Sequence, residues 1–304
     1  MAVGVGAASD PTFTAIDSPE ATYTAPSRIG RNVFTEEDDF SAQANVLKVP
    51  RDFATIQAAV NAASTGDTIK VAAGNYNENV VISTSGLRLR SSEGAVIDGA
   101  GLTGSGIQIL GTAAQPVADV EVSGFEVRDF QRGIVVQFAA RARIIGNDVH
   151  DNNKWPGAVG ALDQAVGIDL VTAQSSDVSQ NSVHNNGAGG IQLRVGSTEN
   201  VLRENRIFEN GALLTADMGG RGVLVTGAFT NDNEMRSNKI LRNFGRGISI
   251  ARPAGTVPIT GNLVLKNRVQ ETSAAAYASW GLRRITSSSR TTRSTITSQD
   301  WRLV

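Results

Sequence analysis

The sequence of 304 residues contains no cysteine and only two histidines. The absence of cysteine excludes a disulfide framework, a thiolate zinc site and a cysteine nucleophile. Two histidines are too few for a histidine-rich metal site. Aromatic residues are few and make up only 5% of the chain.

Excess charge and long apolar segments are also missing. The formal net charge is −1, so no overall basic field attracts nucleic acid, and we expect no nucleic-acid partner. No apolar run approaches the ~20 residues of a membrane-spanning helix. The opening MAVGVGAASD has no basic segment, and its apolar stretch is too short for a standard signal peptide. A removed signal, another export route and an intracellular location all remain open.

Glycine, with 32 residues, is frequent, and together with Asn, Ser, Thr and regular Val or Ile it predicts many short strands and tight turns. Residues 1–45 are rich in Ala, Ser, Thr, Pro and acidic residues without periodicity, which predicts a flexible leader. The following VLKVP predicts a strand. Apolar residues at helical spacing then predict a helix that Gly66 ends; they are Ile56, Ala59, Val60 and Ala63.

The segment from Thr55 to Ile82, TIQAAVNAASTGDTIKVAAGNYNENVVI, resembles the N-terminal cap and first coil of right-handed parallel β-helix proteins of the pectate-lyase-like superfamily. The resemblance covers roughly residues 46–270. It implies an all-β, single-stranded parallel β-helix with an N-terminal helical cap. Pectin esterases, polysaccharide lyases, uronate epimerases and periplasmic β-helix proteins share this entry, so the resemblance is specific for the fold and not for one activity.

A repeated heptad supports this fold independently. Its copies are GFEVRDF (Gly124–Phe130), GNDVHDN (Gly146–Asn152), QNSVHNN (Gln180–Asn186), ENRIFEN (Glu204–Asn210), SNKILRN (Ser237–Asn243) and GNLVLKN (Gly261–Asn267). A second marker is a Gly followed by an aliphatic residue, at Gly133, Gly167, Gly190, Gly222 and Gly247. The connection between a heptad and the next Gly is alternately long and short. Insertions at one corner of a solenoid often mark its binding face.

One coil can be assigned on the segment from Gly190 to Asn210. The first strand covers Gly190–Val195, a second lies near Asn200–Arg203, and the third covers Asn205–Phe208. In the superfamily's geometry, an inward Asn at the turn before the third strand forms a ladder through stacked amides. The residues that fit this ladder are Asn147, Asn181, Asn205, Asn238 and Asn262. The aliphatic row two positions later is Val149, Val183, Ile207, Ile240 and Val264.

The C-terminal segment breaks the pattern. We assign residues 46–285 to the β-helix domain and 286–304 to a C-terminal tail or degenerate cap. Residues 271–304 lack the heptad and are crowded with Ser, Thr and Arg. A degenerate coil, a capping tail, a truncated end and a shifted reading frame remain open.

The resemblance places a polysaccharide groove on the exposed face of the first strands and the corner before them. Alternation sends Ile134, Ile168, Ile191, Val223 and Ile248 inward and their neighbours outward. Among the outward neighbours, Asp169, Gln192 and Arg194 are adjacent. Arg132, Arg221 and Arg246 each precede a first strand in an Arg-Gly-aliphatic context.

β-Elimination of a uronate needs a cation for its carboxylate, a base for the C5 proton and stabilisation of the enolate charge. By analogy with pectate lyases, the candidate catalytic residues are Asp163, Asp169, Asp217, Arg194 and Arg221. The three aspartates would hold Ca²⁺, and either arginine would be the base or the carboxylate clamp. Candidate substrate-binding residues are Lys154, Trp155, Gln164, Gln192 and Arg246. Trp155 could stack on a sugar ring or anchor its loop on the coil below.

Two observations argue against a direct transfer of activity. The sequence lacks the dense Asp cluster of pectate lyases and the Gln and Asp signatures of pectin esterases. Glycoside hydrolysis by paired carboxylates would draw on the same three aspartates. Each of these charged residues can also be read as part of a solvated face.

His150 and His184 occupy the same heptad position in successive coils, about one strand spacing of ~4.8 Å apart. We favour an incidental exposed stack over a two-histidine metal site.

The sequence therefore predicts a monomeric β-helix protein that acts on an acidic polysaccharide as a lyase or C5-epimerase, with Ca²⁺ as its cofactor. The alternatives are a non-catalytic polysaccharide-binding module and a structural, adhesin-like solenoid. The resemblance implies a secreted, cell-surface or periplasmic location.

Overall fold

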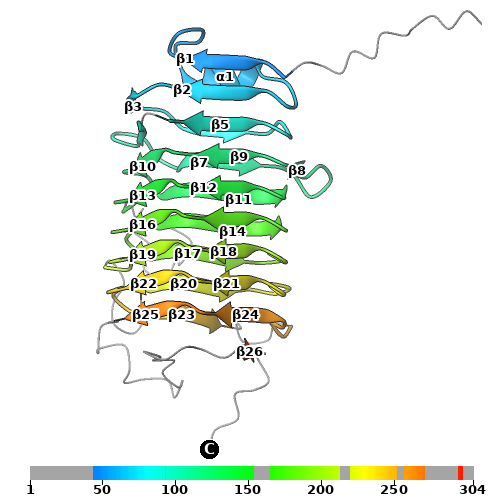
Figure 1. Cartoon of the computed structure of the whole chain (residues 1–304), viewed down its shortest axis with the longest axis vertical. Helices are drawn as coiled ribbons and strands as arrows, with labels where there is room; N and C mark the ends of the chain where they lie inside the picture. The colour runs from blue at the N-terminus through cyan, green and yellow to red at the C-terminus, as the bar shows by residue number, and fades with distance from the viewer. Residues whose placement is uncertain are drawn as a thin grey trace, which may run out of the picture. The chain divides into compact units, whose positions relative to one another are not determined.

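The computed structural model describes residues 44–92, 94–153, 165–212, 220–251, 257–270 and 294–296, the last of these by their backbone alone. Over this part the chain winds into stacked coils that each contribute strands to three parallel sheets, which Figure 1 shows. The fold is a right-handed parallel β-helix, as predicted. The expected leader and the segment 271–285 fall almost entirely outside the described residues.

The first-strand sheet contains the first strand of each coil, and its outer face is the predicted groove floor. Its strands, in spatial order, are β4 (Val80–Ile82), β7 (Ser105–Leu110), β11 (Arg132–Ala140), β14 (Val166–Gln174), β17 (Gly189–Arg194), β20 (Arg221–Thr226) and β23 (Arg246–Ala251), with β8 (Val117–Ala118) pairing with β11.

The second-strand sheet starts beside the helical cap. Its strands are β1 (Val46–Val49), β2 (Thr68–Val71), β5 (Arg88–Ser91), β9 (Glu121–Ser123), β12 (Arg143–Ile145), β15 (Asp177–Ser179), β18 (Val201–Arg203), β21 (Glu234–Arg236), β24 (Asn262–Leu265) and β26 (Ser294–Ile296). Strand β26 pairs antiparallel with β24, whereas the other pairs are parallel.

The third-strand sheet carries the repeated heptads. Its strands are β3 (Gly74–Tyr76), β6 (Ala95–Asp98), β10 (Glu126–Arg128), β13 (Asp148–His150), β16 (Ser182–His184), β19 (Arg206–Phe208), β22 (Lys239–Leu241) and β25 (Arg268–Gln270). The coil predicted from Gly190 to Asn210 matches β17, β18 and β19 within one or two residues.

The core lies between the three sheets and is built from stacked aliphatic rows. In the first-strand sheet the register aligns Ile134, Ile168, Ile191, Val223 and Ile248, as predicted. The first four are fully buried, and Ile248 is partly buried against them. In most three-residue strands of the other sheets only the middle residue is buried, because alternate side chains of a strand point to opposite sides.

A short helix, α1 (Ile56–Ala62), packs against β1, β2 and β4. Its Thr55 side chain accepts a hydrogen bond from the Ala58 N–H at 3.1 Å. The Glu78 carboxylate accepts from the Ile56 and Gln57 N–H groups, both at 2.9 Å. Ile56 and Val60 are buried in the main core, so the predicted helical cap is confirmed. The helix ends before Gly66, which forms a turn with a positive φ of 92°.

Asparagine ladders run along the turns of the coils, and the described residues contain three where the sequence predicted one. Asn147, Asn181, Asn205 and Asn238 form the predicted ladder, in which each amide N–H donates to the next amide oxygen at 2.9–3.0 Å. The last Asn of each heptad forms a second ladder: Asn152, Asn186, Asn210 and Asn243. A third ladder contains Asn200, Asn233 and Asn262.

Two assignments in the last coil were wrong. Asn262 belongs to the third ladder, and Asn267 accepts the hydrogen bond from Asn238 at 2.8 Å in its place. Likewise Val264 pairs with Met235 in the second-strand sheet, whereas Val269 continues the aliphatic row after Ile240. The cause is the spacing of the ladder residues. Within one coil an Asn recurs every five residues, before the second strand, before the third strand and after it, as at Asn200, Asn205 and Asn210. The heptad GNLVLKN, with two Asn residues five apart, therefore matches the second strand as well as the third.

The Gly marker of each coil has a steric origin. A Cβ at Gly190 would lie 2.6 Å from Ile207 Cγ2, 2.7 Å from the Gly222 carbonyl and 3.0 Å from the Asn210 amide nitrogen. These distances leave no room for a side chain. The glycine therefore lets the coil close tightly over the second asparagine ladder.

Among the described residues, no helix is long and apolar enough to cross a membrane.

Candidate functional site

The outward rows of the first-strand sheet are the predicted groove floor. The register aligns Val135, Asp169, Gln192, Leu224 and Ser249 in one such row. All five are buried, with exposed fractions between 0% and 6%. The expected exposed face is therefore absent at this row. For Asp169, part of the reason is visible, because two arginine side chains lie against its carboxylate.

Asp169 on β14 is held by arginines from both neighbouring strands. Arg194 Nε lies 2.9 Å from Asp169 Oδ1, and Arg194 Nη2 lies 2.7 Å from Oδ2. Arg132 Nη1 reaches Oδ2 at 3.4 Å. The Asp169 side chain is 0% exposed, and those of Arg194 and Arg132 are 19% and 22% exposed. A two-pronged, charge-assisted contact of this kind fixes the guanidinium plane of Arg194.

The sequence did not identify Arg132 as a partner of Asp169. Arg132 is in register with Val166, three residues before Asp169, so its long side chain reaches diagonally to the next strand. The signal available in the sequence was the Arg-Gly-Ile context, which places Arg132 at the first position of β11, the neighbour of β14 in the sheet.

Arg221 and Arg246 stand side by side at the starts of β20 and β23, as predicted. No carboxylate among the described residues forms an ion pair with either arginine. The Nε of Arg221 is buried and has no hydrogen-bond partner in the described part of the chain. Burial, and then the positive charge of Arg246, lower the pKa of Arg221 below its usual value of 12.5. Two adjacent cations without an anion form a site that favours a bound anion.

The remaining predicted site residues are not all brought together. Gln192 is buried and lies between Asp169 and Leu224 in its row. Arg221 is on β20, two strands from β14, and in register with Val166, three residues before Asp169, so the backbones of Arg221 and Asp169 are about 14 Å apart. Lys154, Trp155, Asp163, Gln164 and Asp217 lie outside the described residues. Asp169, Arg194 and Arg221 are thus the candidate catalytic residues with a known position.

The described residues do not fit a Ca²⁺ site. They contain no group of three or more His, Asp or Glu side chains that could hold a metal ion. Both oxygens of Asp169 already contact guanidinium groups, whereas Ca²⁺ needs six to eight oxygen ligands.

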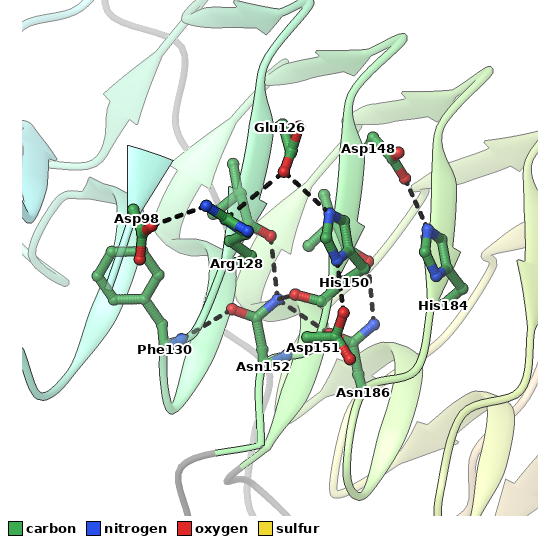
Figure 2. A network of polar contacts seen from close by, with 12 residues as sticks. Asp98, Glu126, Arg128, Phe130, Asp148, His150, Asp151, Asn152, His184 and Asn186 are labelled. Atoms are coloured by element: carbon green, nitrogen blue, oxygen red, sulfur yellow. Dashed lines mark hydrogen bonds and ion pairs between the residues drawn. The ribbon is translucent and has the colours of Figure 1, made fainter. Parts of the chain in front are cut away.

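A second polar network lies on the third-strand sheet, on the side away from the predicted groove (Figure 2). His150 and His184 stack with ring centroids 4.8 Å apart and an interplanar angle of 5°, which confirms the predicted spacing. The two nitrogens of His150 contact Asp151 at 2.8 Å and Glu126 at 3.3 Å. His184 Nε2 contacts Asp148 at 3.0 Å. The imidazoles therefore bind carboxylates, and the described residues around them form no metal site.

Comparison with known proteins gives the fold. The family profile described as right handed beta helix region matches residues 62–231 and 105–291. No curated protein sequence matches the chain.

Several solved structures are similar at low identity. DFA-IIIase from Arthrobacter chlorophenolicus A6 gives a TM-score of 0.50 at 15% identity, covering 75% of this chain and 69% of that one. An alginate lyase from Paenibacillus sp. str. FPU-7 gives 0.43 at 18%, covering 76% and 70%. The Dettilon tailspike protein gp208 gives 0.49 at 16%, covering 73% and 50%. At such identities the likeness shows the fold alone.

Proposed function

The chain belongs to the right-handed β-helix family, and from this premise we propose that it acts on an acidic polysaccharide along its first-strand face. The reaction proposed is that of a lyase or a C5-epimerase. The pectate-lyase-like superfamily, which the sequence resembles, contains enzymes of both kinds. The proposal includes a secreted, cell-surface or periplasmic location.

The observation that carries this proposal is the pair Arg221 and Arg246. The two residues are in register on neighbouring strands, the charge of Arg246 acts on Arg221, and no ion pair with a described carboxylate neutralises either one. An unpaired cation in a half-buried position is unfavourable by itself, so the arrangement suits a ligand that brings the negative charge. The C6 carboxylate of a uronate residue supplies a planar anion that a guanidinium can bind through two hydrogen bonds.

In the proposed reaction, each described site residue has its own role. Arg221, whose pKa is lowered by burial and by Arg246, takes the C5 proton. In a lyase the electron pair of that C–H bond forms the C4=C5 double bond while the C4–O bond breaks and the leaving oxygen takes a proton from water. In an epimerase a proton returns to C5 from the opposite face. Arg246 binds the C6 carboxylate of the sugar, and Arg194, oriented by Asp169, adds positive charge near it. Gln192 was predicted to bind the sugar but is 3% exposed, so no sugar contact is assigned to it.

The proposal assigns Lys154, Trp155 and Gln164 to substrate binding, and Asp163 and Asp217 to the metal and catalytic sites, from sequence alone. Ca²⁺, when bound, would neutralise the uronate carboxylate and acidify its C5 proton. Because Asp169 does not fit as its ligand, no step above depends on the ion.

A non-catalytic role is the second candidate, and burial of the outward row favours it. Val135 and Leu224 point away from the core yet are 0% and 2% exposed. A structural or adhesin-like solenoid needs no exposed groove floor, and a binding module needs only the arginine pair.

Polygalacturonate, alginate, hyaluronan and chondroitin, each with Ca²⁺ and with a chelator, form the test panel. A lyase produces an ultraviolet-absorbing unsaturated uronate, and an epimerase incorporates deuterium at C5 in heavy water. Arg221→Met should abolish either signal, while Arg88→Met on the second-strand sheet should leave it intact. Calorimetric binding without product formation would establish the non-catalytic module. If no polymer in the panel is either turned over or bound, the proposal is overturned.

A further inference from the structure

The outward face of the third-strand sheet changes sign from one end to the other. The register aligns six residues in its first outward row: Glu126, Asp148, Ser182, Arg206, Lys239 and Arg268. The first two are acidic, Ser182 is neutral, and the last three are basic. The Asp148 and Glu126 side chains are 49% and 36% exposed, and the three basic residues are exposed. The row is therefore a linear dipole with its midpoint at Ser182.

The neighbouring outward row is less charged at its centre and half-buried. It contains the stacked rings of His150, His184 and Phe208, with 4.6 Å between the centroids of the last two. Leu241 follows Phe208 in register. Arg206 lies with its guanidinium 4.3 Å above the Phe208 ring, which holds this cation on the face. The strip thus offers an amphipathic centre between an acidic and a basic end.

We propose that this face binds a second copy of the chain in antiparallel orientation. A two-fold axis parallel to the strands, at the level of Ser182, brings each row opposite the same row of the second copy with the coil order reversed. Asp148 then faces Arg206 of the second copy, and Glu126 faces its Lys239. The coils of both copies repeat at the strand spacing of ~4.8 Å, so both contacts form together, and each occurs twice in the isologous interface.

The parallel arrangement is disfavoured because it places acidic residues opposite acidic residues and basic opposite basic. In the antiparallel arrangement the turn residues Asp151 and Glu209 also meet as like charges. Each already has a partner within its own chain: Asp151 contacts His150 at 2.8 Å, and Glu209 forms an ion pair with Arg242 at 2.6 Å. Asp148 and Glu126 also contact histidines, at 3.0 and 3.3 Å, but their side chains stay 49% and 36% exposed and so can contact a second copy. The row pattern therefore decides the orientation.

The strands of this sheet are three to four residues long, so the interface is narrow. Small, polar interfaces belong to weak complexes, and we expect a dissociation constant on the order of 100 μM. Exposed ion pairs are screened by salt, so the dimer should dissociate as ionic strength rises. This inference departs from the monomer expected from the sequence, and it does not depend on the proposed function.

The test is a charge swap followed by sedimentation velocity of the full chain at increasing protein and salt concentration. Arg206→Glu places the introduced glutamate opposite Asp148, and Asp148→Lys places the introduced lysine opposite Arg206. Each variant alone should be monomeric at low salt where the wild type is partly dimeric. An equimolar mixture of the two variants should recover dimer, because every contact is then between opposite charges.

Circular dichroism checks that both variants are folded. Arg88→Glu makes the same charge change on the second-strand sheet and should leave the dimer intact. A monomeric wild type at millimolar concentration, a mixture that stays monomeric, or equal weakening by Arg88→Glu would each overturn the proposal. A monomeric wild type in which Arg206→Glu abolishes polysaccharide binding would identify the basic end as a polyanion site instead.

Discussion

Asp169 and Arg194 form a buried ion pair between neighbouring coils, with contacts of 2.9 and 2.7 Å. The same two-pronged geometry recurs between Asp177 and Arg203, at 3.1 and 2.7 Å, on the second-strand sheet. The two pairs differ in burial. The Asp169 side chain is 0% exposed, whereas the Asp177 side chain is 27% exposed. The fold therefore contains a buried pair and a matched, more accessible one.

We predict that Asp169→Ala lowers the free energy of unfolding by about 3–5 kcal/mol, because it removes the buried carboxylate that Arg194 and Arg132 both contact. Asp177→Ala should cost less than about 1 kcal/mol. Urea denaturation of both variants measures the difference. The double variant Asp169→Leu/Arg194→Leu should recover part of the loss, since a buried pair can be replaced by apolar packing, while Arg132 still lacks the Asp169 carboxylate. Equal losses for Asp169→Ala and Asp177→Ala would contradict the burial argument.

The asparagine ladder should be a major source of stability. Asn205 is buried, donates to the Val178 carbonyl at 2.8 Å and to Asn238 at 2.9 Å, and accepts from Asn181 at 3.0 Å. Asn205→Ala leaves these partners unsatisfied, and we predict a loss of about 3 kcal/mol. Asn153→Ala, at an exposed position, is the control and should change the urea midpoint little. A midpoint shift as small as the control's would show that the ladder is dispensable.

Acid should weaken the second-strand sheet through Glu121. Burial acts to raise the pKa of Glu121, but hydrogen bonding and charge from Arg90 and the charge of Arg143 outweigh it and lower the pKa below its usual 4.5. A lowered folded-state pKa means that the stabilisation is present above about pH 4.5 and is lost as pH falls through the folded value. Glu121→Gln and Arg90→Met should both flatten the fall in unfolding free energy below that pH. An unchanged slope in both variants would refute this origin.

The fold could be predicted because its signals repeat. The heptads and the Gly marker recur in successive coils, so an error in one coil leaves the architecture intact. The register within the last coil was less secure. Asn262 and Asn267 are five residues apart, as are Asn200 and Asn205, and a local pattern cannot tell which turn a given Asn occupies. Only pairing with the preceding coil, through Asn233 and Asn238, separates them.

The site was less predictable because it depends on burial and on diagonal reach. Alternation correctly sent Asp169 outward, yet it could not show that this position is buried. The contact from Arg132 crosses to a residue three positions along the next strand, and no short motif encodes it. The sign change from Asp148 to Arg206 became visible only when the register aligned β13, β16 and β19.

Arg221 should show opposite effects on stability and on binding. Its guanidinium is half-buried, its Nε has no partner among the described residues, and Arg246 repels it. Arg221→Met keeps much of the apolar side chain and removes the unfavourable charge. We therefore predict an unfolding free energy that is unchanged or higher by about 1 kcal/mol. The affinity for the acidic polysaccharide should fall by about tenfold or more, because the anion loses a charged hydrogen-bonding partner.

Arg203→Met is the matched control, because Arg203 already has Asp177 as its partner. It should lower stability slightly and leave polysaccharide affinity unchanged. Urea denaturation and titration calorimetry on both variants give the two quantities. If Arg221→Met destabilises the chain by more than about 1 kcal/mol, the guanidinium stabilises the first-strand sheet, and its assignment as an anion-binding group is wrong. A binding site for an anion keeps positive charges close together without a partner from the chain itself. Removing one such charge, as in Arg221→Met, should therefore stabilise the fold while it weakens binding.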